Sequence, residues 1–150
     1  KQDGQWKIDA RFNKKNLTER IKKIEKFKDK IHYSNNDAIE FMKYHLPKLN
    51  LNLENTLIYL DPPYFDKGHM LYSFYYSSTE HIKLKNFLEN ELEYKWILSY
   101  DDVPFINNLY NDANKNGIFL NHFAYKAKVG KELLISSDNS NLPNIQLSLI

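Results

Sequence analysis

The chain has 150 residues, of which 42% are hydrophobic and 15% aromatic, and its 21 basic and 19 acidic side chains give a formal net charge of +2. Length and composition predict one folded domain with a core and exclude a disordered tail. The chain has no cysteine, which excludes disulfide scaffolds, cysteine-ligated zinc and thiol nucleophiles, and it has no apolar run near the ~18 residues of a membrane span.

Charge is distributed unevenly along the chain. Residues 1–30 carry 11 basic and five acidic side chains, whereas the remaining 120 residues carry a net charge of −4. A basic end on a near-neutral body favours a surface that faces a polyanion. The alternative is a solvated helix face rich in lysine, which needs no such partner.

The first predicted elements are a basic helix, a short strand and a second helix. Asn16, with Glu19 three positions later, predicts the start of the first helix. Residues 31–34 predict the strand, and residues 38–45 predict a helix that Pro47 ends. The apolar residues of the first helix are spaced as one face: Leu17, Ile21, Ile24 and Phe27.

The remaining elements alternate between strands and helices. Residues 56–60 form a continuous apolar run, which predicts a strand covered on both faces, and two prolines end it. After an aromatic loop, the pattern predicts helices at residues 79–92 and 104–110, and strands at residues 95–100, 118–127 and 132–136. The last two strands are close in sequence, which favours an antiparallel pair.

This order predicts an α/β fold with a doubly wound, mixed sheet that ends in an antiparallel hairpin. Ligands of such sheets bind beyond the carboxyl ends of the strands. Asp37, Asp61 and Asp101 each follow a predicted strand, so we expect the three acids to gather at one rim. The alternative is that each aspartate only caps a turn or a helix.

The segment from Leu60 to Tyr64, Leu-Asp-Pro-Pro-Tyr, is the most specific feature of the sequence. Asp61 offers carboxylate oxygens, Pro62 offers a carbonyl without an N–H, and two proline rings fix the backbone. Tyr64 offers a flat ring on which a planar base can stack. The set suits an exocyclic amine, because the oxygens would accept hydrogen bonds from its two N–H groups. The alternative is a Pro-Pro turn with a structural aspartate cap.

These residues resemble the catalytic motif of amino-methyltransferases that use S-adenosylmethionine (AdoMet). Residues 58–76, 96–101 and 130–135 are similar to the Dam-like, D12-class DNA adenine N6-methyltransferases, and residues 11–13 and 33–38 fit the same family. The resemblance implies a Rossmann-like AdoMet-dependent methyltransferase fold. It also implies site-specific methylation of adenine in double-stranded DNA, in the cytoplasm of a prokaryote and associated with its nucleoid.

The resemblance also implies roles for individual residues. Asp61, Pro62, Pro63 and Tyr64 would form the catalytic motif, in which Asp61 and the Pro62 carbonyl hold the N6 amine of a flipped-out adenine and Tyr64 stacks on the base. Asp37 and Asp61 would contact AdoMet. The expected base-pocket residues are Tyr64, Tyr72 and Tyr76, although the last two could equally pack over the sheet rim; Ser99 and Asp101 would support the pocket wall.

The resemblance also implies a division of the chain into two regions. Residues 1–30 would be the end of a target-recognition region with a basic helix, in which lysines and arginines meet phosphates while Arg11 and Asn13 reach base edges. Residues 31–150 would be the C-terminal part of the catalytic domain. The five histidines show no ligand spacing, so we expect no metal site.

One departure from the family pattern is the absence of its glycine-rich AdoMet loop. The four glycines, at positions 4, 68, 117 and 130, are far apart, so the first βα unit is expected to be absent. We therefore expect a C-terminal fragment that binds AdoMet poorly, has little activity alone and needs an N-terminal half or second chain. The alternatives are an amino-methyltransferase of RNA or protein, and a non-catalytic remnant that binds DNA or a partner.

Overall fold

The computed structural model describes residues 12–66, 68, 75–122 and 128–137, with residues 119–122 and 128–131 described by their backbone alone. The chain divides into two compact units, Lys1–Asn36 and Asp37–Ile150. Among the described residues, no helix is both long and apolar enough to cross a membrane.

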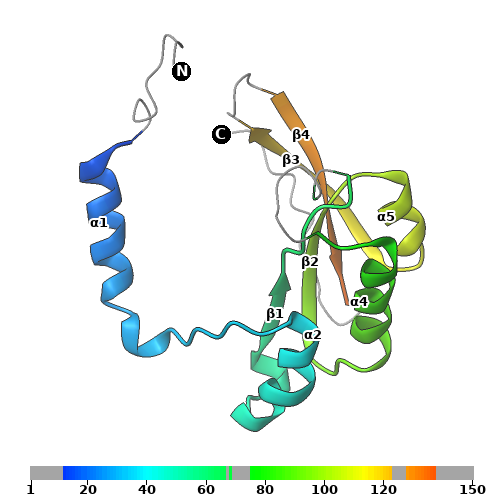
Figure 1. Ribbon diagram of the computed structural model, residues 1–150, viewed down its shortest axis with the longest axis horizontal. Coiled ribbons are helices and arrows are strands. Elements are labelled where there is room, and N and C mark those ends of the chain that lie inside the picture. Colours follow the sequence, from blue (N-terminus) through cyan, green and yellow to red (C-terminus); the bar gives the residue numbers. More distant parts are fainter. Residues whose placement is uncertain (1–11, 67, 69–74, 123–127, 138–150) are drawn as a thin grey trace. The chain divides into compact units, whose positions relative to one another are not determined.

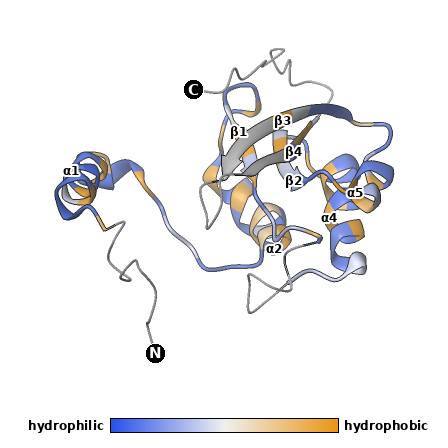
Figure 2. Ribbon diagram, turned by 90° about the horizontal axis from the view of Figure 1, so that it is seen from above, coloured by the Kyte–Doolittle hydropathy of each residue, from blue (hydrophilic) through white to orange (hydrophobic). Residues whose placement is uncertain are grey.

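The first unit contains helix α1 (Lys14–Glu25) and a 3-10 turn (Lys28–Lys30). The predicted cap at Asn16 was wrong, because the side chain of Asn13 accepts the Asn16 N–H at 3.0 Å and starts the helix one turn earlier. Figure 2 shows apolar residues among the hydrophilic ones on α1, as the sequence pattern predicts. No residue of α1 is buried.

The strand predicted over residues 31–34 was also wrong. Residues 31–35 lie in neither helix nor strand, and Tyr33 is 88% exposed. The alternation of apolar and polar residues predicts a strand, but a strand forms only where a neighbour accepts its hydrogen bonds. The described sheet has four strands, and this segment is none of them.

The second unit is built on a mixed sheet of four strands (Figure 1). Strand β1 (Leu57–Leu60) pairs in parallel with β2 (Lys95–Asp101), β2 pairs antiparallel with β4 (Lys128–Ser136), and β4 pairs antiparallel with β3 (Asn114–His122). The spatial order is therefore β1-β2-β4-β3. This arrangement confirms the predicted mixed sheet with an antiparallel pair at its end.

The predicted helix over residues 38–45 is present as three successive turns of different pitch. Helix α2 (Ala38–Glu40) continues into a π-helical turn (Phe41–His45) and a 3-10 turn (Leu46–Leu49). Pro47 lies inside the last turn and so does not end the helical path. Proline has no N–H to donate, and it is tolerated in the first turn of a new helical segment.

Helices α4 (Ser78–Asn90) and α5 (Pro104–Leu109) lie on one side of the sheet and confirm the predicted positions (Figure 1). Along β2, alternate residues point to these helices, and the remaining ones point to the opposite face. The helix-facing residues are apolar, whereas Ser99 and Asp101 lie on the other face. The buried core comprises Met42, Leu46, Leu60, Leu84, Phe87, Leu88, Trp96, Leu98, Tyr100, Ile106, Tyr110, Leu133 and Ile135.

Strand β1 is an edge strand of the described sheet. Leu57 is 54% exposed and Tyr59 62% exposed, so the prediction that both faces of this strand are covered was wrong. An unbroken apolar run is typical of a strand between two covered faces, but what covers a strand depends on neighbours that the run itself does not contain. One edge of β1 therefore carries no partner strand within the described sheet.

Candidate active site

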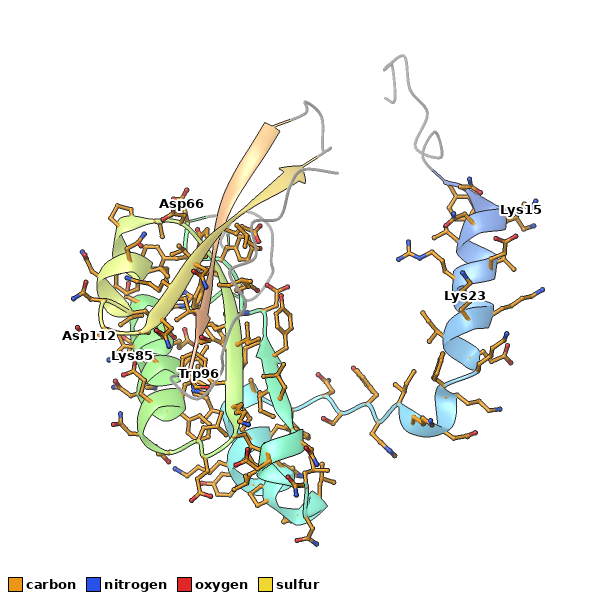
Figure 3. All side chains as sticks on the ribbon, turned by 180° about the vertical axis from the view of Figure 1, so that it is seen from behind. Lys15, Lys23, Asp66, Lys85, Trp96 and Asp112 are labelled. Atoms are coloured by element: carbon orange, nitrogen blue, oxygen red, sulfur yellow. The ribbon has the colours of Figure 1, made fainter. Side chains whose placement is uncertain are left out.

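The Asp-Pro-Pro-Tyr motif begins at the carboxyl end of β1, directly after Leu60. Because β1 and β2 are parallel, their carboxyl ends meet at the same rim, and β2 ends there with Asp101. The structure thus brings two of the three predicted strand-end acids, Asp61 and Asp101, to neighbouring strand ends. In Figure 3, Asp66, which follows the motif, lies well away from Trp96.

Two hydroxyl groups in series orient the Asp61 carboxylate. The Ser99 hydroxyl donates to Asp61 Oδ1 at 2.9 Å, and the Tyr59 hydroxyl donates to Ser99 Oγ at 3.1 Å. Ser99 is buried. Among the described residues, neither Asp61 Oδ2 nor the Pro62 carbonyl accepts a hydrogen bond. Two oxygen acceptors therefore remain for a ligand at the start of the motif.

Tyr64 on the motif is half-buried. Burial, followed by the hydrogen-bonding and charge effects of Glu132 on β4, raises the pKa of Tyr64 well above its usual range. Glu132 is itself buried. The sequence analysis includes Glu132 in the family-like segment 130–135 but gives it no role in the site.

The loop that follows the motif is held by Asp101. Its two carboxylate oxygens accept the backbone N–H groups of Phe65 at 3.0 Å and Asp66 at 2.9 Å. The alternative that this aspartate caps the next helix does not apply, because α5 has Val103 at its N-cap and no side-chain cap. Asp101 is buried, so its charge is compensated by these donors instead of by water.

An aromatic cluster packs behind this loop. Phe65 stacks on Phe105 with ring centroids 4.1 Å apart, and both contact the ring of His81 on α4. His81 is fully buried, and its Nδ1 lies 2.7 Å from the Tyr100 hydroxyl. Tyr76 is half-buried, and its ring packs against His81. Packing of this kind is the alternative to a base-pocket role for Tyr76. Sequence reasoning gave His81 no role in the site.

The other predicted site residues are distributed more widely. Asp37 caps α2, where its Oδ1 accepts the N–H groups of Ile39 at 3.0 Å and Glu40 at 3.1 Å. Its charge also contributes, after burial, to raising the pKa of Tyr76, so the two side chains share one region. Asn13 belongs to the first unit, and Arg11 and Tyr72 lie outside the described residues.

The capping role of Asp37 leads to a prediction. Asp37→Ala is expected to lower the free energy of unfolding by about 1 kcal/mol, because two helix N–H groups lose their acceptor. Asp37→Asn should retain almost all of the stability, since asparagine caps nearly as well. Urea denaturation of the three proteins measures both effects. Equal losses in the two variants would show that the carboxylate charge matters more than the cap.

The second unit also contains a cavity away from the motif. A cavity of about 550 Å³ is lined by Lys85, Trp96, Asp112 and Ser136 among others, and Figure 3 shows the first three close together, away from Asp66. None of the motif residues lines it. Within the ranges that the structure describes, no three histidine, aspartate or glutamate side chains gather as metal ligands would. The polar groups at the carboxyl end of β1 remain the best candidate.

Comparison with known proteins identifies one family that this chain matches. The model of the D12 class N6 adenine-specific DNA methyltransferase family matches residues 3–125, which include the motif, Ser99 and Asp101 but not Glu132. A search of curated proteins found no match. Because the family match extends over most of the sequence, this chain belongs to the D12 class N6 adenine-specific DNA methyltransferases.

Proposed function

We propose that this chain holds the target adenine during site-specific N6-methylation of DNA, and that the methyl donor binds only when a further segment completes the sheet. The observation that carries the proposal is the pair of acceptors at the end of β1, Asp61 Oδ2 and the Pro62 carbonyl, which accept no hydrogen bond from the described residues. An exocyclic amine has two N–H groups, which can donate hydrogen bonds to these two acceptors. The ring of Tyr64 lies two residues further on.

The chemistry follows from what these acceptors do to the amine. When both N–H groups of adenine N6 are held, its lone pair is localised on nitrogen and can attack a methyl group. AdoMet, the methyl donor of the family, supplies that group when it is bound. The residues of this chain orient the amine, and Asp61 can accept the proton that the nitrogen loses. A duplex buries N6 in its base stack, so the adenine must be flipped out.

The described residues fit only part of an AdoMet site. Asp61 lies at the strand end, and Asp37 already uses Oδ1 for two helix N–H groups. The four glycines are too far apart to form a close-approach loop for the donor's methionine end. Within the described sheet, β1 has a partner strand on one edge only, and its other edge can pair with a further strand. We infer that such a strand, from another part of the protein or another chain, completes the donor site.

The basic helix supplies a second contact with DNA in this proposal. Lysine and arginine side chains project from α1 and the turn after it, as Figure 3 shows for Lys15 and Lys23. Such groups bind phosphates without regard to sequence. Asn13, with its side-chain oxygen used as a cap, and Arg11 are the candidates for contacts with base edges. The basic residues of this region are Lys14, Lys15, Arg20, Lys22, Lys23, Lys26, Lys28 and Lys30.

The base site can be tested without knowledge of the DNA target. We expect 2′-deoxyadenosine to perturb the NMR signals of Asp61 and Tyr64, and N6,N6-dimethyl-2′-deoxyadenosine, which has no N–H on N6, to perturb them far less. Asp61→Ala should weaken binding of the first nucleoside to the level of the second. Equal binding of both nucleosides would contradict the proposed role of the two acceptors.

The reaction and its substrate class need a second experiment. Transfer of labelled methyl groups from AdoMet to adenine-containing duplex DNA, ribosomal RNA and protein should be measured in parallel. We expect little transfer by this chain alone, and DNA as the acceptor once the sheet is completed. Fast transfer by the chain alone would contradict the incomplete donor site. Salt-dependent DNA binding without nucleoside binding would favour a non-catalytic role.

A further inference from the structure

We propose that Tyr59, on β1, is a positioning residue that acts through Ser99 and lets the base site distinguish unmethylated adenine from the N6-methylated product. The inference rests on the proposed function of Asp61 as an acceptor for the N6 amine. It assigns a role to a side chain that the resemblance leaves without one. It is drawn from three hydrogen-bonded side chains on the parallel strands β1 and β2 and at the start of the motif.

The first observation is the direction of the hydrogen bonds in this relay, which consists of Tyr59, Ser99 and Asp61. The Ser99 hydroxyl has one hydrogen, which it donates to Asp61 Oδ1 at 2.9 Å. Its oxygen can therefore act as an acceptor, and the Tyr59 hydroxyl donates to it at 3.1 Å. A hydroxyl that accepts a hydrogen bond becomes a better donor, so Tyr59 strengthens the bond between Ser99 and Asp61.

The second observation is that two acceptors compete for the Ser99 hydrogen. Besides Asp61 Oδ1, the Leu60 carbonyl oxygen lies 3.4 Å from Ser99 Oγ. The carboxylate is closer and is the stronger acceptor. The Tyr59 donor occupies one side of Ser99 Oγ and restricts rotation of that hydroxyl. Loss of the Tyr59 hydroxyl should therefore let the Ser99 hydrogen divide between the carboxylate and the carbonyl.

The third observation is a contrast in burial along the relay. Ser99 is 3% exposed, whereas Tyr59 is 62% exposed and Asp61 is also exposed. An exposed carboxylate usually turns freely, but here a buried hydroxyl holds Oδ1, so Oδ2 keeps a defined direction. Burial does not require the bond from Tyr59, because water can satisfy an exposed hydroxyl. Its effect is therefore expected on the carboxylate and not on folding.

Fixed acceptors give the site its preference for the unmethylated amine. Adenine N6 has two N–H groups for Asp61 Oδ2 and the Pro62 carbonyl, whereas the N6 of the methylated product has one. The product leaves one acceptor unpaired beside a methyl group, and a site built to hydrogen-bond a ligand rejects an analogue that lacks the donor. A carboxylate that cannot turn away imposes this loss in full. The relay therefore favours binding of the substrate over retention of the product.

The test compares Tyr59→Phe, Ser99→Ala and their double variant with the wild-type chain in binding of 2′-deoxyadenosine and N6-methyl-2′-deoxyadenosine. Wild type should prefer the first nucleoside about tenfold, the effect of one hydrogen bond to a charged group. Tyr59→Phe should reduce this preference to about threefold by weakening only the binding of the first nucleoside, and Ser99→Ala should reduce it to about twofold. Because Tyr59 acts through Ser99, the double variant should match Ser99→Ala.

The matched control is Tyr44→Phe, which removes the hydroxyl of another exposed tyrosine of the same unit and should leave the preference unchanged. Equal weakening of both nucleosides in Tyr59→Phe would indicate a structural effect and would overturn the proposal. A double variant with a smaller preference than Ser99→Ala would also overturn it, since Tyr59 would then act without Ser99. If Ser99→Ala does not fold by circular dichroism, Tyr59→Phe and its control decide.

A second measurement needs no ligand and separates this inference from the proposed function. The carboxylate carbons of aspartate are labelled with ¹³C, and the Asp61 signal is assigned by its absence in Asp61→Ala. Tyr59→Phe should shift this signal, and Tyr44→Phe should not. If wild type binds neither nucleoside but the signal shifts, the proposed function is contradicted and the positioning of Asp61 is supported. An unchanged Asp61 signal in Tyr59→Phe would overturn the proposal whether or not a nucleoside binds.

Discussion

Asp101→Ala is expected to lower the free energy of unfolding by about 3 kcal/mol, because two partly buried N–H groups, those of Phe65 and Asp66, would lose their acceptor. Each such group left unpaired costs about 1–3 kcal/mol. The loop after the motif would also lose its attachment to β2. Urea denaturation, followed by circular dichroism, measures the change.

Two variants provide the controls for this prediction. Asp101→Asn keeps one side-chain oxygen, so it can satisfy one of the two donors and should lose about half as much stability. Asp66→Ala removes an exposed carboxylate but keeps the backbone N–H, and a surface change of this kind should cost less than about 0.5 kcal/mol. If Asp101→Ala were as stable as Asp66→Ala, Asp101 would not hold the loop.

The second large effect is a loss of stability in acid that originates at His81. Burial lowers the pKa of His81 below its usual value of 6.5, and the charges of Asp101 and Glu80 only partly oppose this shift. The unfolded chain therefore binds more protons than the folded chain between the folded-state pKa and about 6.5. Stability should be complete above that window and should fall, by up to about 1.4 kcal/mol per pH unit, as the pH decreases through it.

His81→Gln is the test of this assignment. Urea denaturation at a series of pH values between 5 and 8, at constant ionic strength, should give a flatter dependence for His81→Gln than for wild type. His32 and His45 are exposed, so His32→Gln and His45→Gln should retain the wild-type slope. The assignment fails if His81→Gln loses stability with falling pH as steeply as the wild-type chain.

Local sequence pattern was sufficient for the elements whose surroundings match their composition. Strand β2 and helices α4 and α5 lie close to where the pattern predicts them, and the antiparallel pair is present, but β3 and β4 each begin four residues earlier than predicted. It failed for residues 31–34 and for the coverage of β1, because both depend on which strands lie alongside. Alternation and apolar runs describe a segment, whereas pairing and burial are properties of its neighbours.

The sequence also predicts one part of the candidate site and not the other. The position of Asp61 after a strand and the presence of acceptors beside Tyr64 follow from a contiguous motif and two prolines. The contacts of the motif loop with distant residues cannot be predicted from the motif. Phe65 and Asp101 are 36 positions apart in sequence, and Glu132 is further still. Nothing in the sequence near Glu132 indicates that it acts on the pKa of Tyr64. The burial of His81 likewise depends on rings that are distant in sequence, those of Phe65, Tyr100 and Phe105 among them.

The spatial order of the sheet has a consequence for how the protein folds. Strands β3 and β4 are antiparallel neighbours in both sequence and space, so they can pair as a local hairpin. Strand β4 lies between β2 and β3, so this hairpin must dock on β2 before Glu132 can face Asp101. Asp101 on β2 can hold the motif loop before that step, whereas Glu132 comes to the rim only when the hairpin docks. Recovery of nucleoside binding during refolding should therefore lag behind formation of the hairpin.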